Sequence, residues 1–407
     1  MDSNTDIDQI VIPEGASNAD PKTLYEVLSQ IPDKRKRRGK RYKVALVLTL
    51  LLLAKMSGEY RLSGISQWAR LRPEWVRDHL PLDRDSLPCG NTYQNVCNQI
   101  DLNELNQQLA DFFAPHIVEE VPVEESSIEE VADAAPQTLR HWVLDGKTIR
   151  GSHRPSHDEQ AQSALALYDL DSQYVVAQRE LAGKGHERAT ALALVQDLDL
   201  RGVLLSADAL HTQPAFCRSV RRQGGDCLLI AKANQSTLHA DIALPFSEPP
   251  RPWLPEMNAK QVNQGHGRLE KRSMRTSCEL NDYLASKWPD VGQVFQLQRT
   301  IIRGNHSTME TVYGLTSLTP KVVSPARLMG FVRAYWQIEN RLHWRRDVTL
   351  GEDACTVSSG QTPQVLASLN NAILAIADRL GVTNLAAQRR TFSARPDDAL
   401  KLLLQPI

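Results

Sequence analysis

The chain has 407 residues, a formal net charge of −1, 42% hydrophobic residues and 23% charged residues, which excludes a fibrous or wholly disordered protein. A chain of this length is expected to form one large domain and at least one smaller one. Its six cysteines show no CxxC spacing, which argues against a zinc ribbon or a disulfide framework and favours a reducing cytosol. The small net charge conceals a basic run at residues 33–43 and an acidic stretch at residues 119–133.

The N-terminal third of the chain predicts helices. Residues 1–20 are polar without apolar periodicity and are expected to be disordered. From residue 21 to residue 117, apolar residues recur at three- and four-residue steps, which predicts a separate helical domain. Its apolar run Val44–Ala54 follows the basic run as in a signal peptide, but it is short for a bilayer span and lies far from residue 1. We interpret this run as a buried helix and expect no membrane association.

After an acidic, proline-containing linker at residues 118–136, the pattern changes to that of an α/β domain, which we place at residues 137–380. Three strands followed by alternating helices and strands are typical of an RNase H-like sheet, although other α/β folds share this order. The predicted strands are residues 142–144, 164–168, 174–176, 203–205 and 227–230, and the predicted helices are residues 188–198 and 214–222.

The alternation of helices and strands is interrupted at about residues 235–318, where proline-rich and strand-like sequence predicts a β-rich insertion. Helix is predicted again from about Pro325 to Arg346 and from Thr362 to Leu380. Residues 381–407 are expected to form a helical C-terminal tail.

Two aspartates follow predicted buried strands. Asp145 comes after His-Trp-Val-Leu, and Asp208 comes after Gly-Val-Leu-Leu-Ser-Ala. A carboxylate at the C-terminal end of a strand projects into the crevice above an α/β sheet. Since aspartate also caps helices and opens turns, neither residue alone distinguishes a catalytic from a structural role.

A pair of divalent metal ions about 3.5–4 Å apart needs a third acid. The segment 331–353 offers Glu339, Asp347, Glu352 and Asp353. On an α-helix, Glu339 would share a face with His343 and Arg346, which would place an acid beside two groups able to contact a DNA phosphate. Helical geometry therefore favours Glu339.

Several segments in fixed order carry a family resemblance. They are LDGKTIRGS from Leu144, SADALHTQ from Ser206, IAKANQ from Ile230, HGRLEKR from His266 and YWQIENRLHWRRDV from Tyr335. Together with IPDKRKRRGKRYK near the N-terminus and QVLASLNNAILAIADRL near the C-terminus, this series resembles the insertion-sequence DDE transposases of the H-repeat-associated branch. The resemblance covers about residues 22 to 405.

The resemblance implies an RNase H-like core with a β-rich insertion, and it matches Asp145, Asp208 and Glu339 to the catalytic acids. It implies phosphoryl transfer with Mg²⁺, for which Mn²⁺ is expected to substitute, on the terminal inverted repeats of the protein's own element. The expected partners are double-stranded DNA at the element ends and the target, and a second copy of the chain in a homodimer. The expected location is the cytoplasm, with nucleoid association on DNA. Tyr335 departs from the family pattern, since a histidine is expected before the tryptophan.

Basic groups near these motifs are candidates for DNA binding, with an ordinary solvated surface as the alternative. The candidates are Lys34, Arg35, Lys36, Arg37, Arg38, Lys147, Arg150, Lys232, His266, Arg268, Arg272, Arg333, His343 and Arg346. Related transposases place auxiliary basic residues at set steps around the glutamate. Here Arg333 lies six residues before Glu339 and Arg346 seven after it, so their roles transfer less directly than those of the acids.

Two other functions remain open from the sequence. The chain could be a catalytically silent, transposase-derived DNA-binding protein, which a magnesium-dependent nicking assay would separate from an active enzyme. It could also be a metal-dependent nuclease without strand joining, which product analysis would reveal.

Overall fold

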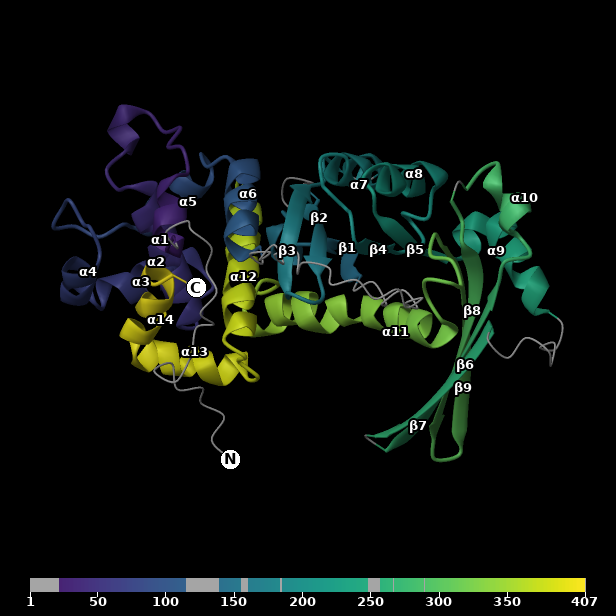
Figure 1. The fold of residues 1–407 in the computed structure, drawn as a ribbon. Coiled ribbons are helices and arrows are strands. Elements are labelled where there is room, and N and C mark those ends of the chain that lie inside the picture. Colours follow the sequence, from purple (N-terminus) through teal and green to yellow (C-terminus); the bar gives the residue numbers. More distant parts are fainter. Residues whose placement is uncertain are drawn as a thin grey trace, which may run out of the picture.

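The protein is described by a computed structural model that covers residues 22–114, 139–154, 160–183, 185–247, 257–265, 267–288 and 290–406. The expected disordered N-terminus and the acidic linker lie outside the described residues. Figure 1 shows a cluster of helices at one end, a sheet with helices on both faces in the middle, and a long twisted group of strands at the other end.

The N-terminal region is helical, as predicted. Its helices are α1 (Leu24–Ser29), α2 (Val44–Met56), α3 (Leu62–Arg70), α4 (Pro73–His79), α5 (Gly90–Cys97) and α6 (Leu102–Phe113). Every residue of α2 is buried, so its apolar side chains meet neighbours on all sides. This confirms the interpretation of the apolar run as a buried helix. In the part of the chain that the structure describes, no helix is long and apolar enough to cross a membrane.

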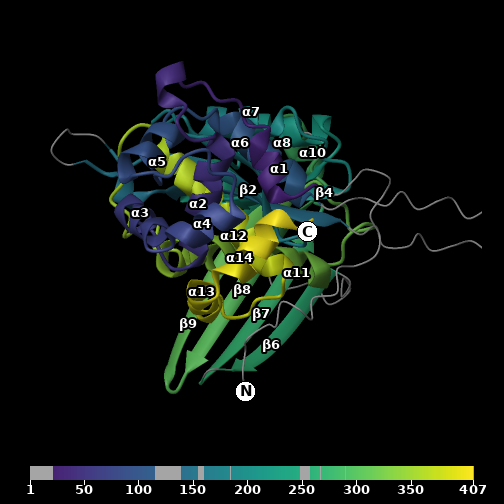
Figure 2. The ribbon, with the colours of Figure 1, turned by 90° about the vertical axis from the view of Figure 1, so that its left-hand side faces the viewer.

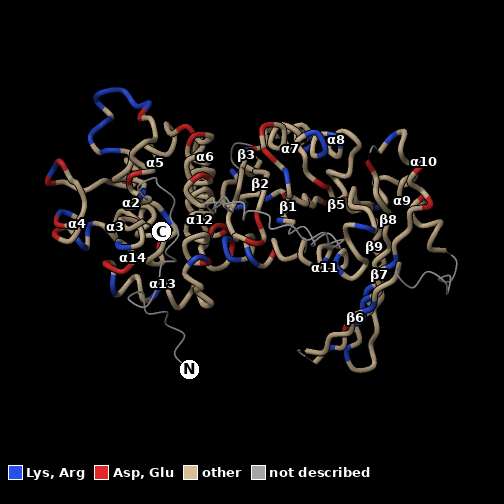
Figure 3. Tube along the Cα trace, in the orientation of Figure 1, with Lys and Arg blue, Asp and Glu red and all other residues tan. Residues whose placement is uncertain are grey.

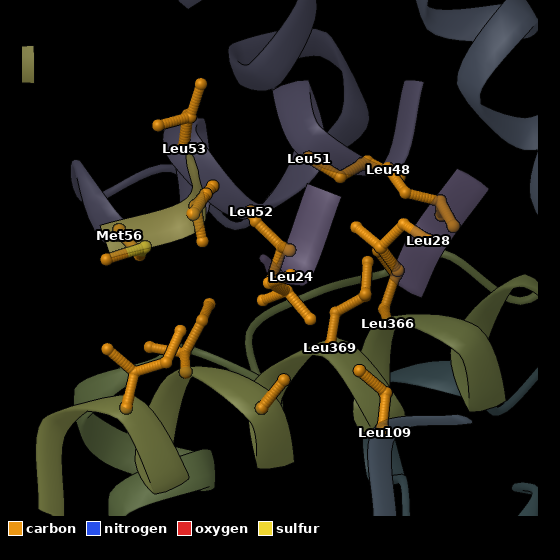
Figure 4. Close-up of a cluster of buried hydrophobic side chains, with 14 of the residues drawn as sticks. Leu24, Leu28, Leu48, Leu51, Leu52, Leu53, Met56, Leu109, Leu366 and Leu369 are labelled. Carbon is orange, nitrogen blue, oxygen red and sulfur yellow. The ribbon is translucent and has the colours of Figure 1, made fainter. Parts of the chain in front are cut away.

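These helices share a hydrophobic core with the three C-terminal helices α12 (Thr362–Arg379), α13 (Leu385–Ala394) and α14 (Pro396–Leu404). Figure 4 shows Leu24 of α1 and Leu52 of α2 facing Leu369 of α12. Val143 of the sheet belongs to the same cluster. Figure 2 views this end of the molecule, with the N-terminal and C-terminal helices grouped together. The packing therefore joins a region that the sequence suggested to be separate both to the sheet and to the C-terminal helices.

The central sheet has the strand order of an RNase H-like core. Its first five strands, in the order β3-β2-β1-β4-β5, are β1 (Arg140–Thr148), β2 (Ser163–Asp169), β3 (Tyr174–Glu180), β4 (Val203–Ala207) and β5 (Asp226–Ala231). Strands β1, β4 and β5 are parallel, whereas β2 and β3 are antiparallel to their neighbours. In Figure 1, helices α7 (Glu187–Val195) and α8 (Pro214–Arg222) cover one face and α11 (Pro325–Tyr335) crosses the other. The predicted RNase H-like fold class is thus confirmed.

The predicted β-rich insertion continues the same sheet. It contains helices α9 (Ser236–Ala243) and α10 (Asn281–Ala285) and strands β6 (Asn258–Gly265), β7 (Arg268–Ser277), β8 (Gln293–Arg303) and β9 (His306–Thr316). Strand β9 pairs with β5, which extends the sheet to nine strands among the described residues. The junction is tight, because a Cβ atom on Gly314 of β9 would lie 2.5 Å from the carbonyl oxygen of Leu229. The far ends of β6–β9 project from the body of the molecule (Figure 1).

Candidate active site

Asp145 and Asp208 lie side by side on neighbouring strands. The last paired residues of the parallel strands β1 and β4 are Leu144 and Ala207; Asp145 is the next residue of β1, and Asp208 is the first residue after β4. Leu144 and Ala207 pack in the core beneath α7 and α8. Because side chains alternate along a strand, both carboxylates project from the opposite face, toward α11.

Strand β1 is longer than the sequence predicts. It continues past Asp145 to Thr148 because its antiparallel pairing with β2 extends to Thr148 and Ser163. Asp145 therefore lies within a strand, at the point where the parallel pairing with β4 ends. The surrounding sheet fixes its backbone on the β2 side.

The hydroxyl group of Tyr335, at the end of α11, has all three predicted acids as neighbours. Burial raises the pKa of Tyr335, and the negative charges of Asp145, Asp208 and Glu339 raise it further. The charges of the three carboxylates therefore act on one buried phenol, which remains protonated at neutral pH. The sequence marks this residue only as a departure from the family pattern.

The chain beyond α11 is wound as a π-helix in two consecutive segments, η8 (Glu339–His343) and η9 (Arg345–Thr349). The Trp344 N–H donates to the Glu339 carbonyl oxygen, and the Leu350 N–H donates to that of Arg345, each five residues back. The prediction of one α-helix from Pro325 to Arg346 is therefore wrong in its winding. Short π-helical segments are rare in proteins, and those that occur are often found at functional sites.

The π-helical winding separates side chains that an α-helix would align. Glu339 is exposed, whereas His343 and Arg346 are buried. His343 faces Asp145 on β1, and Arg346 faces Asn371 on α12. The predicted common face of Glu339, His343 and Arg346 does not form, because Arg346 is directed to α12 whereas His343 is directed to β1.

Hydrogen bonds hold both carboxylate oxygens of Asp145. Its Oδ2 lies 2.9 Å from Nε2 of His343, and its Oδ1 accepts the backbone N–H of Gly146 at 2.9 Å. His343 is only 5% exposed, so its contact in this structure is the acid and not a group in solvent. The imidazole ring thereby fixes the orientation of the Asp145 carboxylate.

The loop after β4 holds Asp208. Its Oδ1 accepts the backbone N–H of Leu210 at 3.0 Å, which ties the side chain to its own loop. His211 follows on this loop. Burial lowers the pKa of His211, while the charges of Asp208, Glu187 and Asp145 oppose this shift. A lowered pKa favours the neutral imidazole at neutral pH.

The donor types at this site fit a hard divalent cation. Carboxylate oxygens are the ligands that Mg²⁺ prefers, and two of them are adjacent by strand register. Glu339, the third predicted acid, is exposed. Among the residues that the structure describes, no three acidic, histidine or cysteine side chains already stand together in metal-ligating geometry.

The predicted basic contacts closest to the acids differ in exposure. Lys147 is 8% exposed, and its Nζ lies 2.5 Å from Oδ1 of Asp347. Arg346 is 1% exposed and forms two hydrogen bonds to Glu352, at 2.8 and 3.0 Å. Arg150 is exposed, 3.6 Å from Asp353. Of these three cations, only Arg150 can meet a phosphate without first leaving a buried ion pair.

The other acids that the sequence offers as the third catalytic residue have different partners. Asp347 pairs with Lys147, and Glu352 pairs with Arg346 and accepts a hydrogen bond from Asn370. Burial raises the pKa of Asp353, and the charge of Asp347 raises it further. The Lys147–Asp347 pair joins residues that are far apart in the chain, and charge patterns along the sequence cannot reveal it.

The remaining predicted contacts lie farther along the sheet and on the β6–β9 strands. Lys232 and Arg333 are exposed, and Arg268 is partly exposed. Arg272 is buried on β7, where its guanidinium lies 2.7 Å from Glu270. His266 lies outside the described residues.

The basic run near the N-terminus divides in the same way. Lys36, Arg37 and Arg38 are exposed. Lys34 is largely exposed but pairs with Asp101 at 2.7 Å. Arg35 is buried, and it bonds to Asp33 and to the Gly39 and Tyr42 carbonyl oxygens, which folds the loop on itself. In Figure 3 the blue loop near α5 lies at the opposite end of the molecule from β6–β9.

Comparisons with known proteins agree with the RNase H-like strand order. The family model described as "Transposase DDE domain" matches residues 136–375, and the model described as "DDE_Tnp_1-associated" matches residues 25–113. An "Uncharacterized protein in dhlA 3'region" of Xanthobacter autotrophicus is 32% identical over 272 residues, which cover 66% of this chain and 84% of that protein.

Two relatives in Escherichia coli carry transposase names. The "H repeat-associated putative transposase YhhI" of strain K12 is 23% identical over 387 residues, covering 92% of this chain and 96% of that protein. The "Putative transposase YncI" of O157:H7 is 22% identical over 355 residues, covering 87% of this chain and 86% of that protein. Because the DDE domain model spans more than half of the chain, the protein belongs to the DDE transposase family, as an insertion-sequence transposase of the H-repeat-associated type.

Proposed function

We propose that this transposase binds the terminal inverted repeats of its mobile element and cleaves and joins DNA strands there. Asp145, Asp208 and Glu339 are the proposed metal-holding carboxylates, with Mg²⁺ as the ion and Mn²⁺ as its substitute. The observation that carries the proposal is the register of β1 and β4, which brings Asp145 next to Asp208; the charges of both acids and of Glu339 also act on the buried Tyr335 phenol. Divalent ions bound by these acids would activate the attacking hydroxyl and stabilise the leaving oxygen.

The chain's own residues contribute position and charge. The parallel pairing of β1 and β4 sets Asp145 beside Asp208, and His343 fixes the Asp145 carboxylate. Glu339 lies on η8, which follows α11 on the face of the sheet opposite α7 and α8. The protonated Tyr335 hydroxyl remains available to donate a hydrogen bond to an acid or to a phosphate oxygen.

We propose double-stranded DNA, at the element ends and at the target, as the substrate. The cations able to meet its phosphates are those that remain exposed, namely Lys36, Arg37, Arg38, Arg150, Lys232 and Arg333, together with the partly exposed Arg268. An element has two ends, so the working complex is proposed to be a homodimer.

The test replaces each acid by its amide. A carboxamide nearly keeps the shape of a carboxylate but cannot neutralise or anchor a divalent ion in the same way. Asp145→Asn, Asp208→Asn and Glu339→Gln should each lower cleavage and joining of an element-end duplex by orders of magnitude. Binding of the same duplex in a gel shift should persist, because the proposed phosphate contacts are on other residues.

Asp199→Asn is the matched control. Asp199 is an exposed acid that precedes the start of β4, whereas Asp208 follows its end, so this variant should leave cleavage and binding unchanged. Full cleavage by Asp145→Asn would contradict the proposed acids. A wild-type protein that binds but never nicks would indicate a catalytically silent DNA-binding protein. A wild-type protein that nicks without joined products would indicate a nuclease.

A further inference from the structure

Two side-chain pairs connect β1 with the π-helical segment, a name used here for η8 and η9 together. His343 meets Asp145, with 2.9 Å between Nε2 and Oδ2, and Asp347 meets Lys147, with 2.5 Å between Oδ1 and Nζ. Asp145 and Lys147 are two residues apart on a strand, so they project from the same face. His343 and Asp347 are four residues apart, about one helical turn. The two pairs are therefore adjacent, and we call them the first and second rung. In the first rung β1 provides the acid, Asp145, and in the second it provides the base, Lys147.

The second rung lies away from solvent. The side chain of Lys147 is 8% exposed and that of Asp347 is 25% exposed. A lysine ammonium group in such a position requires a nearby negative charge, because removal from water penalises an unpaired cation. Asp347 provides that charge, and a DNA phosphate could replace it only if the pair opened.

The segment that carries Asp347 also carries Glu339. Hydrogen bonds that span five residues wind both η8 and η9, whereas the default winding of a polypeptide helix spans four. Interactions from outside the helix are needed to favour the rarer winding. The rungs to β1 supply such interactions on the sheet side, and the Arg346–Asn371 hydrogen bond supplies one on the side of α12.

We propose that Lys147 and Asp347 are a positioning pair that holds the π-helical segment in register with β1, so that Glu339 reaches the site of Asp145 and Asp208. This inference rests on the proposed function of the three acids. It assigns Lys147 to the geometry of the reaction instead of to DNA affinity. Neither member of the pair touches the reacting phosphate.

The experiment uses the full-length protein, an element-end duplex and three readouts. These are the salt dependence of duplex binding, the single-turnover cleavage rate at saturating duplex, and the midpoint of thermal unfolding. Lys147→Gln and Asp347→Asn should each slow cleavage at saturating duplex about tenfold or more, while the affinity and its salt slope stay at wild-type values. If Lys147 instead bound a phosphate, Lys147→Gln would reduce the salt slope by about 0.9.

A double variant separates positioning from stability. Lys147→Met combined with Asp347→Leu removes both charges and leaves no unpaired buried ion, so its unfolding midpoint should stay near that of the wild type. Its cleavage should nevertheless remain slow, because the ion pair that sets the register is absent. Lys147→Arg keeps the ion pair and should restore most of the cleavage rate.

Asp226→Asn is the matched control for the removal of a half-buried ion pair. Asp226 is 23% exposed and pairs with Arg221 at the N-terminal end of β5, away from the strand ends that lead to Asp145 and Asp208, so this variant should be less stable but cleave normally at saturating duplex. Wild-type cleavage by the double variant would overturn the positioning role. So would normal cleavage by Asp347→Asn together with a smaller salt slope for Lys147→Gln. Asp145→Asn, assayed alongside, distinguishes the two proposals: if it is inactive while the pair variants cleave normally, only the positioning inference fails.

Discussion

Individual charged residues in this protein have roles that depend on their partners in the fold. Glu352 and Glu339 lie on the same stretch of sequence, and both are candidates for the third acid on sequence alone. Burial alone would raise the pKa of Glu352, but the charge and hydrogen bonds of Arg346 and the amide of Asn370 lower it below its ordinary value. Glu352 is therefore an ionised acid with partners in the fold, whereas Glu339 is exposed and is the acid that we propose for the chemistry.

This assignment predicts an acid-sensitive contribution to stability. A carboxyl group with a lowered pKa in the folded state stabilises the protein above its unfolded pKa, and that stabilisation disappears as the pH falls through the folded value. Glu352→Gln should cost about 3–5 kcal/mol near neutral pH, because it leaves the Arg346 charge buried without a partner. Denaturant unfolding as a function of pH should show this cost shrinking toward acidic pH. A cost that does not change between neutral and acidic pH would contradict the ion pair.

Residue patterns predict the position of the acids better than the partners of the cations. The strands that lead to Asp145 and Asp208 were predictable because each contains a short apolar run, although β1 extends beyond Asp145 to Thr148. The partners of Arg35, Lys147 and Arg346 were not, because a run of positive charges looks the same whether its members face solvent or buried acids.

At the scale of secondary-structure elements, the largest difference from expectation is the winding of the segment after α11. Its apolar residues recur at steps that suit an α-helix, and nothing local distinguishes the two windings. The π-helix depends on interactions with β1 and α12, which come from elsewhere in the chain. Tertiary packing thus decides a local structure that the sequence pattern leaves open.

The basic loop before α2 leads to a prediction about how strongly DNA binding depends on salt concentration. Replacing Lys36, Arg37 and Arg38 together by glutamine should flatten the salt dependence of duplex binding, by about 0.9 in slope for each phosphate that these side chains neutralise. The same triple variant should keep the wild-type unfolding midpoint, because these side chains are exposed. Arg201→Gln, at an exposed site elsewhere, serves as the control. An unchanged slope in the triple variant would show that this loop is an ordinary solvated surface and does not bind DNA phosphates.

At the scale of the whole molecule, the proposed site depends on three parts of the chain that are far apart in sequence. The sheet places Asp145 and Asp208, and the segment after α11 places Glu339 beyond an insertion of four strands. Helix α12 packs behind that segment and joins it to the N-terminal helices. The fold class was predictable from the order of the elements, whereas this shared packing was not, because the partners of an amphipathic or wholly apolar helix cannot be read from its own sequence.

The most direct test of the three-carboxylate centre is to locate the bound metal on the protein itself. Fe²⁺ can replace Mg²⁺ in a carboxylate site, and with peroxide and ascorbate it produces radicals that cut the backbone next to the ion. We expect cuts near residues 145, 208 and 339 in the DNA-bound protein, which excess Mg²⁺ suppresses and Asp145→Asn abolishes. Cuts that cluster instead near Asp347, Glu352 and Asp353, or that are indifferent to Mg²⁺, would contradict the three-carboxylate centre.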